Sequence, residues 1–272
     1  MQRVLNSVIL ATASLIGLGA FVYPFLVPQQ SQSFSAAAHA QDAPLIFLLL
    51  VALCLAAVLS SLSAGLLNAK LIAVLGILTA LNAVLRGVPG PGGFNLIFLL
   101  PIVCGYAYGS TFGFLLGVFS LAVSAFIGFG VGPWLPYQMF SVGWVGLLSG
   151  WLPSLARRPR AEVWMLAGWG FVLGLVFGAL MNLWFWPYVF HPGQSEMFWQ
   201  PGLGLGETLK RYALFYLVTS FWWDLLRAAG NFMLLLVLGA PLLRLLRRFQ
   251  QRFYFAVSPL QGTVRHDWNG HE

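Results

Sequence analysis

Residues 44–66 read PLIFLLLVALCLAAVLSSLSAGL, a continuous run without one charged side chain. A helix needs about 20 mostly apolar residues to cross the hydrocarbon core of a bilayer. The chain around this run has 272 residues, of which 59% are hydrophobic and 8% are charged, with a mean hydropathy of +0.83. Because soluble domains carry about 25% charged residues, this composition excludes a water-soluble protein and predicts an all-α polytopic membrane protein.

The same criterion predicts eight transmembrane helices. They cover residues 4–27, 44–66, 70–87, 94–109, 112–131, 138–153, 163–187 and 212–241. Most connections are short and rich in Gly and Pro, which is typical of tight turns at a membrane surface. No stretch shows the alternation over about 10 residues that a strand of a membrane barrel requires.

The basic residues predict the orientation of the helices. With a cytoplasmic N-terminus, ten of them fall on the inner side, namely Arg3, Lys70, Arg157, Arg158, Arg160, Arg244, Arg247, Arg248, Arg252 and Arg265. Three fall on the outer side, namely Arg86, Lys210 and Arg211. Since Lys and Arg concentrate in cytoplasmic loops, both termini are predicted to be cytoplasmic. The net charge of +7 then reflects topology, and the outer loops are 28–43, 87–94, 131–137 and 188–211.

The N-terminus allows a second interpretation. Met1, Gln2 and Arg3 precede an apolar run, and Ala38-His39-Ala40 has the small-x-small pattern of a signal-peptidase site. Against cleavage, the apolar run is long for a signal peptide and the motif lies well beyond its end. The orientation of the other seven helices is the same in both interpretations.

Small residues divide the chain into parts. Gly-xxx-Gly pairs occur only in the later helices, at Gly105/Gly109, Gly113/Gly117, Gly146/Gly150 and Gly170/Gly174/Gly178. Such pairs let helix backbones approach closely in lipid. We therefore expect a two-helix hairpin at 1–67, a six-helix membrane domain at 68–253 and a cytoplasmic tail at 254–272. The absence of an internal repeat disfavours a transporter built from two inverted halves.

Motifs for several kinds of chemistry are absent. The chain has no phosphate-binding P-loop, no H-E-x-x-H and no G-x-S-x-G. Two histidines (His39, His191) lie in predicted outer loops and two (His266, His271) in the tail, and the two cysteines (Cys54, Cys104) lie in apolar runs. Neither set has the spacing of a metal site or a disulfide framework. We therefore expect no cofactor and no metal.

One predicted helix carries charge inside the membrane. Asp224, Arg227 and Asn231 are spaced i, i+3 and i+7, which places them on one helical face. At 1.5 Å per residue the Asp224–Arg227 pair lies in the outer third of the bilayer. Intramembrane charge is costly and marks a functional site by default. The pair either binds a substrate or only holds helices together.

Further polar and aromatic residues fall near the same outer side. The candidates for substrate binding are Asn182, Trp134, Gln138 and Trp186. The Asn182 amide can pair with Asn231 or with a ligand. The aromatic residues fit either an interfacial belt or stacking on a flat ring in a pocket.

The third predicted helix has a ridge of small residues. Ala69, Ala73, Gly76 and Ala80 follow one another from its cytoplasmic end. Such a ridge serves packing within the bundle or docking onto a separate membrane subunit.

Together these features resemble the substrate-binding S component of energy-coupling factor (ECF) transporters over about residues 68–253. The matching segments are Ala69–Ala73, Gly132–Met139, Gly178–Trp184 and Asp224–Asn231. The resemblance implies a six-helix bundle in a bacterial-type plasma membrane that binds a vitamin or related micronutrient from outside. It also implies partners, namely a transmembrane coupling subunit that contacts Ala69 and Ala73 and a pair of ATPase subunits that bind the ATP.

Two other functions are compatible with the residues. An intramembrane enzyme acting on a lipid-linked substrate would use Asp224 as an acid or base. A structural membrane-assembly protein would use Asp224 and Arg227 only to hold helices together. The resemblance favours a non-enzymatic binding component over both.

Overall fold

The computed structural model describes residues 2–26, 39, 41–63, 69–88, 90, 94–189 and 192–253. These residues form nine α-helices joined by short 3₁₀ and π turns. The helices are α1 (Gln2–Leu26), α2 (Ala43–Ser63), α3 (Ala69–Leu85), α4 (Leu99–Tyr108), α5 (Ser110–Ser124), α6 (Leu135–Ser149), α7 (Pro159–Phe185), α8 (Leu205–Thr219) and α9 (Phe221–Phe253). The predicted tail 254–272 and the two alanines of the Ala38-His39-Ala40 motif lie outside the described residues.

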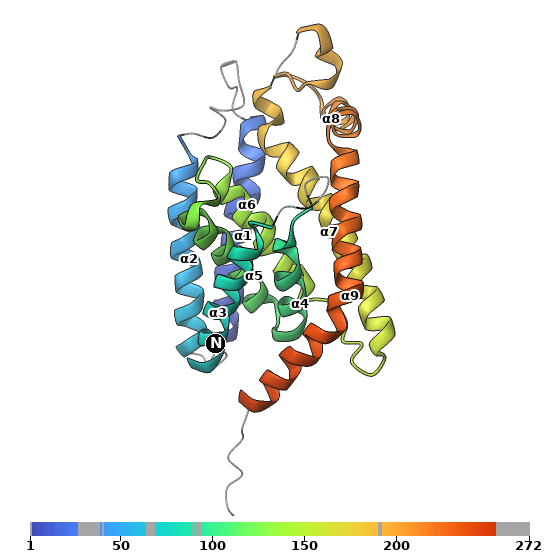
Figure 1. The fold of residues 1–272 in the computed structure, drawn as a ribbon. Coiled ribbons are helices and arrows are strands. Elements are labelled where there is room, and N and C mark those ends of the chain that lie inside the picture. The colour runs from blue at the N-terminus through green and yellow to red at the C-terminus, as the bar shows by residue number, and fades with distance from the viewer. Residues whose placement is uncertain are drawn as a thin grey trace, which may run out of the picture.

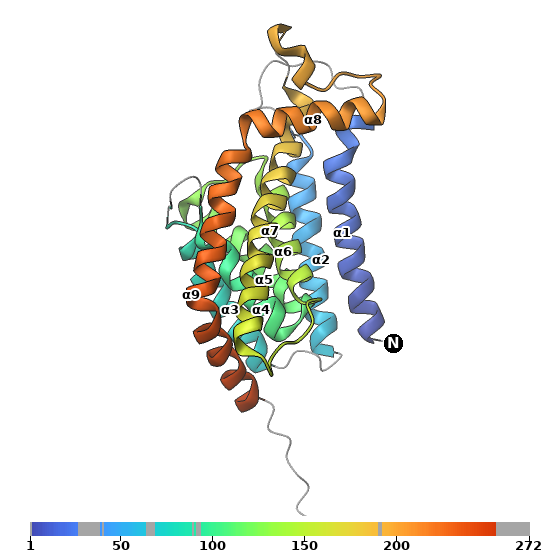
Figure 2. The same ribbon diagram turned by 90° about the vertical axis from the view of Figure 1, so that its right-hand side faces the viewer.

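The long helices run side by side, and one helix lies across them. Figures 1 and 2 show α1, α2, α7 and α9 along the length of the bundle, with α8 across one end. The start of α1 and the end of α9 both lie toward the opposite end. We call the end covered by α8 the capped end and the opposite one the open end.

Glycines bring three helices together in the centre. A Cβ on Gly105 or Gly113 would overlap the carbonyl of Gly146, and one on Gly117 would overlap that of Val142. Helices α4, α5 and α6 therefore pack backbone against backbone, as the Gly-xxx-Gly pattern predicts for association in lipid. The surrounding core is apolar, and Cys104 in it is fully buried.

The seam between α7 and α9 is lined by the second glycine series. Gly170 faces Leu235, and Gly174 would place a Cβ 2.9 Å from the Cα of Ala228. Near the open end, Glu162 of α7 forms an ion pair with Arg247 of α9. The two helices are thus held by close packing along their length and by a charge pair at one end.

The N-terminal hairpin packs on the central helices. Gly17 of α1 lies against the ring of Phe140, and the indole N–H of Trp144 donates a 3.1 Å hydrogen bond to Ser14. The facing surface of α2 buries Leu50 and Cys54. Helices α1 and α2 therefore belong to the same packed bundle as the rest of the described chain.

The prediction of eight spans is shown only in part. In the described part of the chain, five helices are long and apolar enough to cross a membrane. They are Val4–Leu26, Ala43–Ser63, Ser110–Phe129, Pro159–Tyr188 and Phe221–Gln251, and two apolar helices, Ala69–Leu85 and Leu96–Tyr108, are shorter. Two helices begin earlier than predicted because a proline, Pro136 or Pro159, occupies the first turn, where its missing N–H costs nothing.

The predicted single helix at 212–241 is wrong. The chain forms α8, breaks at Ser220, and continues as α9 to Phe253. Helix α8 begins in a segment predicted to be loop, and it carries Glu207, Lys210 and Arg211. These charges do not fit a membrane core, which explains why α8 lies across the bundle end instead of extending α9 (Figure 2).

Candidate functional site

The break between α8 and α9 is fixed to α7 by Asn182. The Ser220 hydroxyl donates a 2.7 Å hydrogen bond to Asn182 Oδ1, and Asn182 Nδ2 donates a 2.8 Å bond to the carbonyl of Gly178. Ser220 also bridges the two helices, because its N–H bonds to Tyr216 and its carbonyl accepts from the N–H of Asp224. The Asn182 amide is thus used for the break and not for pairing with Asn231.

Asp224 and Arg227 form the ion pair that their spacing predicts. Asp224 is buried in the first turn of α9, and Gly178 of α7 provides its space, since a Cβ there would overlap the carboxylate. The guanidinium carbon of Arg227 lies 5.5 Å from the centroid of the Phe177 ring, within cation–π range. The charge pair therefore lies at the α7–α9 seam, at the capped end.

Asn231 is buried two turns further along α9. It is 2% exposed, and in the described part of the chain neither its amide nitrogen nor its oxygen has a hydrogen-bond partner. Asp224 Oδ2 also makes no hydrogen bond of normal geometry there, although Tyr216 interacts with Asp224 electrostatically. Buried polar groups are normally hydrogen-bonded, so these atoms are unsatisfied hydrogen-bonding groups on this face of α9.

Gln138 belongs to a second polar cluster, beside the first. Its Oε1 accepts a 2.8 Å hydrogen bond from Arg86, which follows α3, and Arg86 also donates to the hydroxyl of Ser124 at 2.7 Å. Asn95 donates a 2.6 Å bond to the carbonyl of Arg86. The sequence treats Arg86 only as a topology marker, so the structure adds it to the polar groups of this end.

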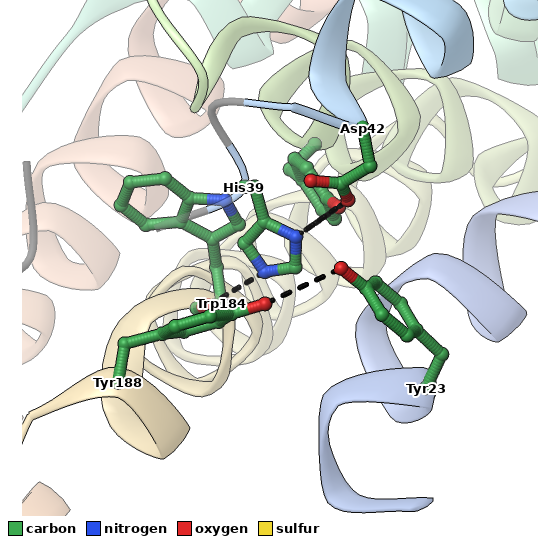
Figure 3. A network of polar contacts seen from close by, with 6 residues as sticks. Tyr23, His39, Asp42, Trp184 and Tyr188 are labelled. Atoms are coloured by element: carbon green, nitrogen blue, oxygen red, sulfur yellow. Dashed lines mark hydrogen bonds and ion pairs between the residues drawn. The ribbon is translucent and has the colours of Figure 1, made fainter. Parts of the chain in front are cut away.

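A third cluster surrounds His39 (Figure 3). Its Nδ1 lies 2.7 Å from Asp42 Oδ2, and its Nε2 donates a 3.1 Å hydrogen bond to the carbonyl of Trp184. Tyr23 and Tyr188 approach the imidazole edgewise. The cluster ties the segment before α2 to α1 and α7, so His39 is a buried structural residue and not a solvated loop histidine.

Asp42 is the charged member of that cluster. Tyr137 of α6 donates a 2.7 Å hydrogen bond to its Oδ2. Burial alone would raise the pKa of Asp42, but the hydrogen bonds from His39 and Tyr137 outweigh burial and hold this pKa below its ordinary value. The carboxylate therefore remains charged at neutral pH and keeps the hairpin attached.

The two predicted tryptophans have different environments. Trp134 is 37% exposed at the start of α6, where Gly132 leaves room for its ring. Trp186 is fully buried, and its indole N–H donates a 2.9 Å hydrogen bond to the carbonyl of Met197. Trp186 packs with Phe198 and Trp199 and with Phe215 of α8. It therefore stabilises the covering segment and leaves no ring face for a ligand.

An open groove of about 540 Å³ lies between α2 and the turn that leads into α6. Its lining is apolar and includes Phe47, Phe126, Val131, Pro133 and Pro136. None of the seven predicted substrate-binding residues lines it. Its chemistry suits lipid chains better than a polar solute.

The small-residue ridge of α3 is on the outside of the bundle. Ala69, Ala73, Gly76 and Ala80 are all exposed, and nothing lies within 4 Å of where a Gly76 side chain would be. The opposite face of α3 is buried through Leu71, Leu75 and Asn82. The ridge is therefore not used for packing among the described helices.

The predicted substrate-binding residues thus fall into separate groups at the capped end. Asp224, Arg227, Asn231 and Asn182 lie along the α7–α9 seam, Gln138 lies with Arg86, Trp134 is at the surface and Trp186 is enclosed. The sequence places His39 and Arg86 on the outer side but does not predict the polar clusters to which they belong. The i, i+3 spacing of His39 and Asp42 is the one sequence signal that indicates the His39 cluster.

Comparison with known proteins gives one result at the level of the family. The family model described as the substrate-specific component of ECF transporters matches residues 70–239. No curated protein and no solved structure matches the chain. The matched segment includes three residues of the α3 ridge (Ala73, Gly76 and Ala80), Arg86, Gln138 and the α7–α9 seam as far as residue 239 of α9. Because it covers more than half of the chain, the protein belongs to the family of substrate-specific components of ECF transporters, which are membrane transport proteins and not enzymes.

Proposed function

We propose that the protein captures a vitamin or related micronutrient outside the cell and passes it to the cytoplasm through ATP-driven partner subunits. The family match over residues 70–239 carries this proposal. The buried atoms of Asp224 and Asn231 that are unpartnered within the described chain, on one face of α9, support it. The chain itself binds no ATP in this scheme.

The substrate binds at the capped end, beside the α7–α9 seam. Asp224 and Arg227 supply charge, and Asn231 supplies a donor and an acceptor that have no partner in the described chain. Gln138 contacts the substrate from α6 and Trp134 from the surface. Asn182 and Trp186 act indirectly, because the first fixes the α8–α9 break and the second packs the segment before α8 against α8.

The α3 ridge docks onto the transmembrane coupling subunit. Ala69 and Ala73 lie at its start, and all four small residues are exposed. Small residues allow the close helix approach on which association in lipid depends. The pair of ATPase subunits acts on this protein through that contact.

The capped end faces the outside, and both termini face the cytoplasm. Arg157, Arg158, Arg160, Arg244 and Arg248 all lie in the segments toward the open end, as the positive-inside rule requires of a cytoplasmic side. Accessibility of single cysteines to a membrane-impermeant maleimide in intact cells tests this orientation.

The deciding experiment is native mass spectrometry of the full chain co-expressed with its coupling subunit and ATPases. We expect a stoichiometric vitamin-like molecule and the assembled transporter. Ala73→Trp should keep the molecule and lose the partners, whereas Val237→Trp, at an exposed position of α9, should keep both. A chain that retains neither small molecule nor partners would instead indicate a structural assembly role.

A further inference from the structure

Arg86 is a half-buried base held between three helices at the capped end. It follows the last residue of α3, and its two terminal nitrogens donate to Ser124 of α5 and Gln138 of α6 at 2.7 and 2.8 Å. An arginine that only marks the membrane surface extends its head group into water. Arg86 instead points its head group into the bundle, toward the fully buried Ser124.

The partners of Arg86 hold it in one orientation. Ser124 donates its own proton to the carbonyl of Leu121 at 2.7 Å, so its oxygen is free to accept from Arg86. Asn95 fixes the Arg86 carbonyl, and its side-chain oxygen accepts from the N–H of Ile97. A group that is fixed before binding does not pay the ordering cost on binding.

No carboxylate in the described part of the chain forms an ion pair with Arg86. The described acids near the capped end have other bases, since Asp42 contacts His39, Asp224 pairs with Arg227, and Glu207 pairs with Lys210 and Arg211. Glu196 is exposed. A partly buried charge is normally paired with an opposite charge, so the charge of Arg86 calls for an added anion.

Arg86 and Gln138 keep N–H groups that can donate hydrogen bonds to such an anion. A guanidinium has five N–H groups, and Ser124 and Gln138 account for two of them. The amide nitrogen of Gln138 makes no hydrogen bond among the described residues. Carboxylates and phosphates are the acceptors that match the planar fork of arginine.

We propose that Arg86, positioned by Ser124 and Gln138, binds a carboxylate or phosphate group of the transported micronutrient. This inference rests on the proposed function and narrows it, because it makes the substrate an anion. Gln138 donates to the same group through its amide nitrogen. Arg227 does not take this role, since Asp224 already neutralises its charge.

The test measures binding of matched probes to the full chain in nanodiscs of neutral phosphatidylcholine. The pairs are biotin and biotinamide, pantothenate and panthenol, and pyridoxal phosphate and pyridoxal. The first two pairs test a carboxylate and the third a phosphate. Native mass spectrometry of the protein as purified gives the charge of any molecule it retains.

We expect the anionic ligand to bind about 10- to 100-fold more tightly than its neutral counterpart, as for hydrogen bonds to a charged group. Arg86→Gln should remove this difference, Arg86→Lys should keep part of it, and Lys210→Gln, an exposed base at the same end, should change nothing. The probe comparison on the unmodified chain needs no variant, so it holds even if Arg86→Gln does not fold.

Three results would overturn the proposal. They are equal binding of the charged and neutral probes, a retained ligand that is neutral or cationic, and an anionic lipid as the molecule lost in Arg86→Gln. In each the protein can still assemble with its ATPases, so the proposed transport function stands. A chain that retains no molecule, binds no probe and fails to assemble would refute both.

Discussion

Each end of the α7–α9 seam contains one acid and one arginine, but only the pair at the open end joins the two helices. At the open end, Glu162 and Arg247 come from different helices, and both carboxylate oxygens are occupied. Tyr106 donates a further 2.7 Å hydrogen bond to Glu162. At the capped end, Asp224 and Arg227 lie on the same helix, so their pair cannot join α9 to α7.

The difference shows which charges are structural. A carboxylate with all its hydrogen bonds satisfied acts as a clamp between helices, and it has nothing left to offer a ligand. The capped end is held together by glycine packing and by the Asn182–Ser220 hydrogen bond, while the Asn231 amide stays unpartnered within the described chain. The Glu162 carboxylate at the open end of the seam therefore has its hydrogen bonds made, whereas the capped end keeps buried polar atoms without partners among the described residues.

The largest effect is expected at Gly178, because the packing of the capped end requires a glycine there. Gly178→Val should lower the melting temperature in detergent by about 10 °C, because its side chain overlaps the Asp224 carboxylate and overpacking costs about 3 kcal/mol. Gly168→Val is the matched control, since nothing lies within 4 Å of a Cβ at that position of the same helix. Equal melting temperatures for the two variants would contradict glycine packing at this end.

The next effect tests the clamp at the open end. Glu162→Gln should destabilise the protein by about 2 kcal/mol, less than for a fully buried pair because the Arg247 side chain is 32% exposed. Thermal unfolding in detergent measures this loss, and substrate affinity should not change. Glu207→Gln removes an exposed carboxylate from the surface of α8 and should have no measurable effect. A loss of substrate affinity in Glu162→Gln would show that the clamp also shapes the site.

The sequence predicts the capped end better than the open end. Asp224, Arg227 and Asn231 are neighbours along one helix, so their spacing alone places them on one face, and the structure confirms the pair. Glu162 and Arg247 are 85 residues apart, and no local pattern shows that the fold joins them. Arg86 and Gln138 are hidden for the same reason, because they meet only after α3 and α6 are packed.

Local sequence features also explain why α8 is not predicted as a separate helix. Residues 205–219 contain charges and aromatic side chains together, which excludes a spanning helix but not one lying flat on the bundle. The apolar run continues past Ser220, so a window that only averages hydropathy joins parts of two helices. The break depends on the hydrogen bond between Ser220 and Asn182, which is a tertiary contact.

A smaller effect, of opposite sign, is expected at Asn231, whose buried amide has no hydrogen-bond partner among the described residues. Asn231→Leu should raise the melting temperature by about 3 °C, because it removes a buried amide without partners, worth about 1 kcal/mol. It should also abolish binding of the retained ligand, as measured by native mass spectrometry. Asn182→Leu is the control, since that amide is fully bonded and its loss should destabilise the protein. A destabilised Asn231→Leu that keeps its ligand would make Asn231 a structural residue.

The smallest effect is the coupling between the two ends. Asn231 and Arg247 are 16 positions apart on α9, or about 24 Å at 1.5 Å per residue, and sites this distant add independently to within about 0.5 kcal/mol. The double variant Glu162→Gln/Asn231→Leu should therefore show the sum of the two single changes in unfolding free energy. A larger coupling would mean that α9 transmits strain along its length, so that the clamp at the open end senses whether a ligand is bound at the capped end. Measuring the unfolding free energy of Glu162→Gln with and without the retained ligand separates these cases, since only a transmitted effect changes when the ligand is removed.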